Sequence, residues 1–171
     1  MKTAKTLAIV LLLLVVAAAV IVPNFLPAKV DRSQQEWKAV RRAIDFCKAQ
    51  QAFKAQGLSA EFDAAKQGWF ATSLGQLDIK DQEVEFPSLD FLKATSPDKA
   101  IDGYYFVLGP CGQDDFGIYA APAKYGRGCR KTFYAKSTID VWEKDIEAGA
   151  PRPGVKPDLD DGWHRSVLVV K

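Results

Sequence analysis

A short acidic segment near the C-terminus could hold a cation. Asp158, Asp160 and Asp161 place their carboxylates close together, and Gly162 follows them directly. Carboxylate oxygens at a turn are the ligands that Ca²⁺ prefers. A twelve-residue helix–loop–helix calcium site would need Glu at position 169, where the chain has Val169. Two interpretations stay open, a calcium site and an acidic turn that is simply solvated, and we favour the solvated turn.

The single histidine does not indicate catalysis. His164 lies between Trp163 and Arg165, without the accompanying spacings of a catalytic triad or a metal site. We expect it to face solvent or to pack. The sequence also lacks the motifs of serine nucleophiles and of glycine-rich phosphate loops. It therefore predicts no enzymatic activity, no cofactor other than the open calcium site, and no small-molecule substrate.

The cysteines divide into a pair and a single residue. Cys111 and Cys129 flank a loop rich in Gly, Asp and Pro. We expect a disulfide between them, which would contribute about 3 kcal/mol in the chain-entropy model and would fit an oxidising compartment. Cys47 lies in a helical stretch, where a small buried apolar side chain is the expected role.

The N-terminal part of the chain is strongly apolar. Residues 7–22 are all apolar, and no charge occurs in residues 6–28. As a helix, this stretch would span about 34 Å, enough to cross a hydrocarbon core of ~30 Å. A cleaved secretory signal is the alternative, but its apolar part is normally shorter. We expect a retained single-pass anchor, with Lys2 and Lys5 on the cytoplasmic side.

Beyond the anchor, the pattern predicts one helix followed by an antiparallel sheet. Apolar residues recur at spacings of three and four up to Gly57, which is typical of an amphipathic helix. They are Val30, Trp37, Val40, Ile44, Cys47 and Phe53, joined by Ala43 and Phe46. Short aromatic and β-branched segments separated by turn residues predict strands at residues 103–109, 116–121, 131–135, 138–142 and 166–170.

Charge and length limit the function classes. The 171-residue chain has 23 basic and 21 acidic residues, a net charge of +2. Because Lys2 and Lys5 precede the apolar run, the rest of the chain is neutral. Binding of nucleic acid needs several cations on one face, so we expect no nucleic-acid partner. The length beyond the anchor fits one domain.

The end of the apolar run resembles a known family. Residues 16–28 read VAAAVIVPNFLPA, and Pro23-Asn24-Phe25-Leu26 is the specific part. The passage resembles the one in which the long helix of type IV pilins and type II secretion pseudopilins leaves the bilayer. Weaker likenesses to the family lie in residues 69–77 and 121–134.

The resemblance implies an α+β, pilin-like fold, in which one long N-terminal helix, half transmembrane and half amphipathic, packs on a small antiparallel β-sheet. Residues 1–28 would be the transmembrane anchor, 29–57 the amphipathic continuation of the helix, and 58–171 an extracytoplasmic α+β domain. The location implied is a bacterial inner membrane, with the main domain in the periplasm. Pseudopilins bind calcium in a C-terminal loop, a place similar to that of Asp158.

The resemblance also implies a non-catalytic structural subunit of a filament, pseudopilus or membrane complex. Its N-terminal helix would contact lipid and pack with other membrane helices or copies of itself. The assembly face would comprise Leu11, Leu14, Ala18, Val22, Pro23 and Phe25. The glycine of the family's leader and the Glu of its helix have no counterpart here. The alternative is therefore a single-pass accessory subunit of a larger inner-membrane complex with no filament role.

Overall fold

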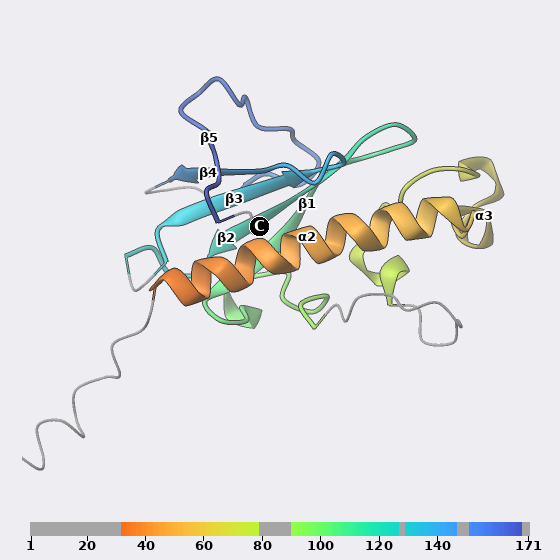
Figure 1. The fold of residues 1–171 in the computed structure, drawn as a ribbon. Coiled ribbons are helices and arrows are strands. Elements are labelled where there is room, and N and C mark those ends of the chain that lie inside the picture. The colour runs from red at the N-terminus through yellow and green to blue at the C-terminus, as the bar shows by residue number, and fades with distance from the viewer. Residues whose placement is uncertain (1–31, 79–89, 127–128, 147–150, 169–171) are drawn as a thin grey trace, which may run out of the picture. The chain divides into compact units, whose positions relative to one another are not determined.

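The computed structural model describes residues 32–78, 90–126, 129–146 and 151–168, which belong to one compact unit, Arg32–Lys171. This unit contains the helices α2 (Arg32–Ala55) and α3 (Ser59–Phe62), followed by strands (Figure 1). The strands are β1 (Tyr104–Cys111), β2 (Phe116–Pro122), β3 (Lys131–Lys136), β4 (Val141–Asp145) and β5 (His164–Arg165). Short 3₁₀ helices lie at Ala64–Lys66, Leu74–Leu77 and Pro97–Lys99.

The predicted fold, a pilin-like helix that is half transmembrane and half amphipathic, is wrong. The long helix of the described residues is α2, which begins at Arg32. No helix in the described part of the chain is long and apolar enough to cross a membrane. The reason lies in its side chains. Lys38, Arg41 and Lys48 place a charge on nearly every turn of α2, so only one side of the helix is apolar enough to be buried.

The sheet is an antiparallel meander with the strand order β1-β2-β3-β4-β5. The first three strands confirm the sequence prediction to within a few residues. The fourth begins at Val141, later than predicted, because Lys136–Asp140 forms a turn in which Ile139 has φ +62° and Thr138 Oγ1 donates to Asp140 Oδ2 at 2.7 Å. The fifth was predicted at residues 166–170, but β5 is His164–Arg165.

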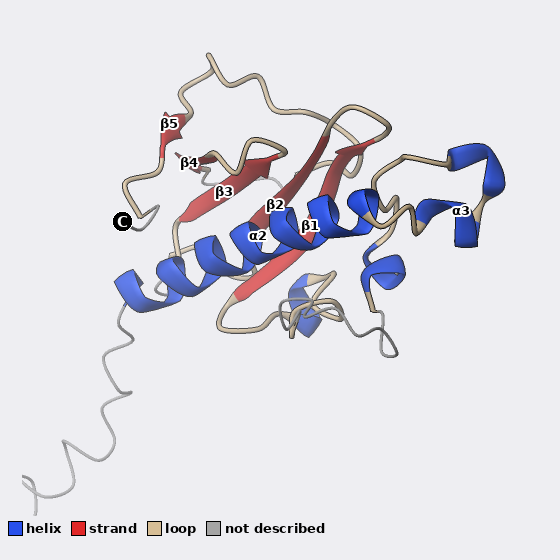
Figure 2. Cartoon of the chain, turned by 45° about the vertical axis from the view of Figure 1, so that its right-hand side comes forward, coloured by secondary structure: helices blue, strands red, loops and turns tan. Residues whose placement is uncertain are grey.

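Helix α2 covers one face of the sheet, where β2 and β3 are its main strand neighbours, and Figure 2 shows it in front of the sheet. Phe46 is fully buried there and meets Phe116 of β2 edge-on, with ring centroids 5.9 Å apart. Gln50 is the buried polar residue of this face. Its Nε2 donates to the Ala71 carbonyl at 2.9 Å, and its Oε1 accepts from the Ala71 amide at 2.7 Å. The helix therefore also secures the coil that follows it.

An irregular segment covers the opposite face. This C-terminal strap, residues 151–168, contains β5, and its Trp163 packs on Tyr119 and Tyr134. Tyr119 OH donates to the Val155 carbonyl at 2.8 Å, which fastens the strap to β2. Tyr134 is fully buried, yet its hydroxyl has no hydrogen-bond partner among the described residues. The two faces of the sheet thus have covers of different kinds.

Candidate functional site

A groove of about 280 Å³ lies along one flank of α2. The helix supplies most of its lining, and Leu168, which follows β5, closes one side. The lining residues are Trp37, Val40, Arg41, Ile44, Asp45, Lys48 and Leu168. Val40 is fully buried and forms the floor, whereas Trp37 and Ile44 are partly exposed. The groove therefore has an apolar interior that opens to solvent.

Helical geometry places these residues on one flank. Trp37, Arg41, Ile44 and Lys48 are spaced by four, three and four residues, so they follow one another along a single side of the helix. With a rise of 1.5 Å per residue, Arg41 and Lys48 are separated by roughly 10 Å along the axis. The cations thus stand toward the two ends of the groove, with Ile44 between them.

The two cations of the groove, Arg41 and Lys48, are exposed. The Arg41 guanidinium lies 5.3 Å from the centroid of the Trp37 ring, a cation–π contact that holds it beside the apolar floor. Neither Arg41 nor Lys48 forms an ion pair with any residue that the structure describes. Asp45 lies between them on the same flank. The groove therefore offers two separated positive charges around apolar surface.

The opposite flank of α2 is closed by a network of ion pairs. Arg42 donates to both oxygens of Asp90 at 2.9 Å, and its Nη2 lies 2.8 Å from Asp102 Oδ2. Lys38 Nζ reaches Asp102 Oδ1 at 3.1 Å. Burial alone would raise the pKa of Asp102, but Arg42 and Lys38 outweigh it and the pKa is lowered. The hydrogen bond to Asp90 is the main reason that the pKa of Arg42 is raised. These contacts secure the coil before β1 against this flank of the helix.

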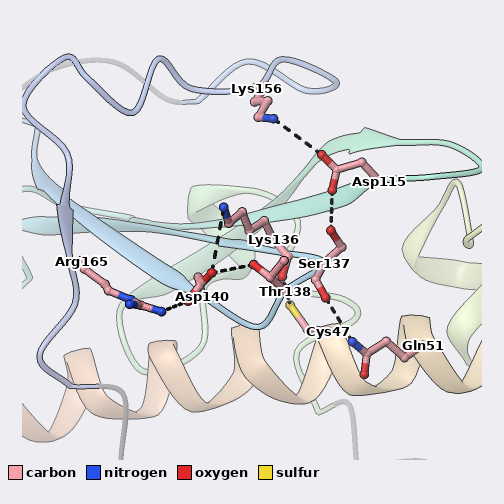
Figure 3. A network of polar contacts seen from close by, with 9 residues as sticks. All are labelled: Cys47, Gln51, Asp115, Lys136, Ser137, Thr138, Asp140, Lys156 and Arg165. Atoms are coloured by element: carbon pink, nitrogen blue, oxygen red, sulfur yellow. Dashed lines mark hydrogen bonds and ion pairs between the residues drawn. The ribbon is translucent and has the colours of Figure 1, made fainter.

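A second polar network joins the far end of α2 to the sheet and the strap (Figure 3). Ser137 Oγ donates to Asp115 Oδ1 at 2.6 Å, and Gln51 Nε2 donates to the Ser137 carbonyl at 3.1 Å. The second Asp115 oxygen lies 3.7 Å from Lys156 Nζ of the strap. Because Asp115 also accepts from the Phe116 amide, the network holds two turns in place and indicates a structural role.

Asp140 fastens the end of the strap in the same region. Its carboxylate accepts from Thr138 Oγ1 and pairs with Arg165 of β5 (Figure 3). The hydroxyl of Thr138 is the main reason that the pKa of Asp140 is lowered, with a further contribution from Arg165. The ionised carboxylate is therefore part of the folded structure.

The residues of the predicted calcium site do not converge. Asp158, Asp160 and Asp161 are all exposed in the strap. Asp158 Oδ1 accepts from the Asp160 amide at 3.1 Å, and Lys144 Nζ lies 2.8 Å from Asp161 Oδ2. Within the described ranges, no group of three or more His, Cys, Asp or Glu side chains could hold a metal ion. Calcium binding at this turn stays a prediction, and the ammonium of Lys144 occupies one of the carboxylates it would need.

The structure does not bring Cys111 and Cys129 together, and both are free thiols. Cys129 Sγ donates to Gln35 Oε1 at 3.1 Å and lies beside Gly103, just before β1. Cys111 is the last residue of β1. A strand of this length spans on the order of 25 Å, whereas a disulfide needs Cα atoms within ~7 Å. The predicted pairing therefore does not fit this fold.

The remaining cysteine and the histidine behave as predicted. Cys47 is fully buried, and burial raises the pKa of its thiol. Its Sγ donates to the Lys136 carbonyl at 3.5 Å. His164 is exposed in β5, opposite Glu143 of β4. Neither residue faces the groove.

The predicted assembly face lies outside the described residues, as do the prolines of the family-like passage. This applies to Leu11, Leu14, Ala18, Val22, Pro23 and Phe25. Their role in packing with other membrane helices stays a prediction.

No family model, curated protein or solved structure matches the chain. The fold and the groove define a helix-on-sheet α+β domain with an open flank on its main helix. The resemblance to pilins and pseudopilins is therefore carried by the quoted residues alone.

The sequence did not predict the groove, although it identified several of the lining residues as part of the apolar stripe. The apolar stripe of α2 predicts a buried face, and Trp37, Val40 and Ile44 all belong to that stripe. The missing information was which edge of the stripe the rest of the chain leaves open. The available signal was the width of the stripe, because Trp37 and Ile44 extend it beyond the face that one sheet covers.

Proposed function

We propose that this chain is a membrane-tethered, non-catalytic subunit whose folded domain binds a partner protein through the groove on α2. The observation that supports the proposal is the groove itself, with an apolar floor and two exposed cations that have no ion-pair partner among the described residues. Interface cores combine apolar surface with aromatic residues and Arg, as Trp37 and Arg41 do here.

The proposed membrane tether, the apolar run at residues 7–22, favours a partner in the same membrane. The apolar run ends at Val22, ten positions before α2 begins at Arg32. Even a fully extended chain spans at most about 3.6 Å per residue, so the start of α2 would lie within roughly 35 Å of the bilayer. A domain tethered this closely can engage another membrane protein or a protein attached to one.

Two measurements test the proposal on the full-length chain. The chain should sediment with membranes, resist an alkaline carbonate wash and be released by detergent. A photoreactive side chain at Lys48 should form a discrete adduct with one protein, and the same group at Lys124, exposed on the loop after β2, should not. Ile44→Asp should remove the adduct at Lys48. Release by carbonate would contradict the tether, and equal adducts at both positions would contradict the groove.

A further inference from the structure

We infer that the groove on α2 takes an amphipathic helix of a partner protein that carries two acidic residues about two turns apart. This inference rests on the proposed function and names the chemistry of the occupant. Three features of the groove support it: its direction along α2, the spacing of its cations, and the acidic residue between them.

The direction of the groove favours a helix. Its lining extends from Trp37 to Lys48, about three helical turns and roughly 16 Å along the axis. A second helix lying beside α2 would present apolar residues at spacings of three and four to Trp37 and Ile44. Leu168 closes the far side, so the partner would be held between α2 and the end of the strap.

The cations define where the carboxylates lie. Arg41 and Lys48 are seven residues apart on one flank, so Glu or Asp residues at positions i and i+7 of a partner helix can reach both. Stacking on Trp37 already restricts the Arg41 guanidinium, which lowers the entropy that binding must remove. Asp45 repels a carboxylate placed between the two cations. The middle of the partner helix should therefore be apolar, and this fixes its register.

Charge also argues against the other occupants. Two copies that met through this groove would bring Arg41 and Lys48 of one copy against the same cations of the other, and like charges in an interface are unfavourable. Two cations are too few to support binding to a phosphate backbone. A partner helix with apolar and acidic residues can cover the apolar floor and pair with both cations.

The test uses full-length protein in detergent micelles and a labelled helical peptide with Glu at i and i+7 and Leu at i+3 and i+4. Fluorescence anisotropy should show saturable binding that weakens with salt. The double variant Arg41→Glu/Lys48→Glu should lose about tenfold in affinity or more, because two attractions become repulsions. The same variant should gain affinity for a peptide in which both Glu residues are Lys. Lys124→Glu, a matched charge reversal outside the groove, should change neither affinity.

Each outcome decides the inference. Binding of the Glu peptide with reversed preference in the double variant supports it. Equal binding of the Glu and Lys peptides, no binding of either, or loss of binding in Lys124→Glu overturns it. Circular dichroism of each variant identifies a folding defect, and Ile44→Asp supplies an independent disruption of the groove. If the Glu peptide fails while the adduct at Lys48 persists, the groove binds a partner of different chemistry and the proposed function survives.

Discussion

The two faces of the sheet bury aromatic side chains of similar size but under different covers. On one face, helix α2 places Phe46 against Phe116 and Gln50 against the Ala71 backbone. On the other, the proline-containing strap places Trp163 over Tyr119 and Tyr134. The helix satisfies its own backbone hydrogen bonds, so its side chains are free to fill the core. The strap needs separate contacts to hold each part of its backbone.

The difference shows in the buried polar groups. Gln50, beneath the helix, makes two hydrogen bonds. On the strap side, Tyr134 OH and Trp142 Nε1 are buried without a hydrogen-bond partner among the described residues, and on α2 Arg42 Nη1 is buried without one as well. Each buried unsatisfied group costs about 1–3 kcal/mol. Because Arg42 still bonds two carboxylates through its other nitrogens, the strap face has the larger share of such groups. Four changes would break or sharpen this comparison.

The largest expected effect is on the helix face. Phe46→Ala should lower the free energy of unfolding by about 3–5 kcal/mol, because Phe46 is fully buried in a regular core that cannot collapse around the cavity. Trp163→Ala should cost less than half as much, because the irregular strap can move inward. Urea denaturation measures both. Equal losses would mean that the strap is packed as rigidly as the helix.

The second change contrasts the buried polar groups. Gln50→Ala leaves the Ala71 amide and carbonyl without partners and should cost about 2–4 kcal/mol. Tyr134→Phe removes an unpaired hydroxyl and should be neutral or stabilising by up to about 1 kcal/mol. The free energies of unfolding from urea titrations provide the test. A clear loss for Tyr134→Phe would show that the hydroxyl has a partner after all.

The third change tests a close approach on the strap face. A Cβ on Gly117 would clash with the ring and hydroxyl of Tyr134, so Gly117→Ala should cost about 1–3 kcal/mol. Gly112→Ala, where a Cβ meets nothing within 4 Å, is the matched control and should stay within about 0.5 kcal/mol of the native chain.

A double-mutant cycle identifies the cause of that loss. Adding Tyr134→Leu removes the aromatic ring that the new methyl group would meet, so the double variant should cost less than the sum of the single changes. Additive losses would place the strain of Gly117→Ala in the backbone rather than in the contact with Tyr134.

The smallest expected effect concerns pH. Asp140 holds the end of the strap, and its pKa is lowered from the ordinary value of 3.8. A carboxylate whose pKa is lowered in the folded state stabilises the fold fully at pH values above its ordinary pKa. This stabilisation is lost as the pH falls from the ordinary pKa through the lowered pKa. Because Arg165 is largely exposed, the contribution is ~0.2–1 kcal/mol. Asp140→Asn should remove this part of the acid dependence in urea titrations between pH 5 and 2.5. An unchanged pH profile would contradict the role of Asp140.

Local sequence patterns predicted most of the strands but not the contacts between residues that are distant in the sequence. The first three strands follow from aromatic and β-branched runs bounded by turn residues, and those signals lie within the strands themselves. The Cys111–Cys129 pairing failed because strand direction separates residues that flank one loop-rich stretch. The calcium prediction could not include Lys144, which reaches the turn at Asp161 from strand β4.

By itself, the sequence determined the amphipathic character of α2, the hairpin strands that follow and the burial of Cys47, because spacing and local propensity act within a few residues. Only the tertiary structure decided which flank of α2 the coil covers through Arg42 and Asp90, and which flank is left as the groove between Trp37 and Lys48. It also decided that an irregular strap covers the second face of the sheet. Which segment covers each surface depends on contacts between residues that are far apart in the sequence. A short stretch of sequence does not contain that information.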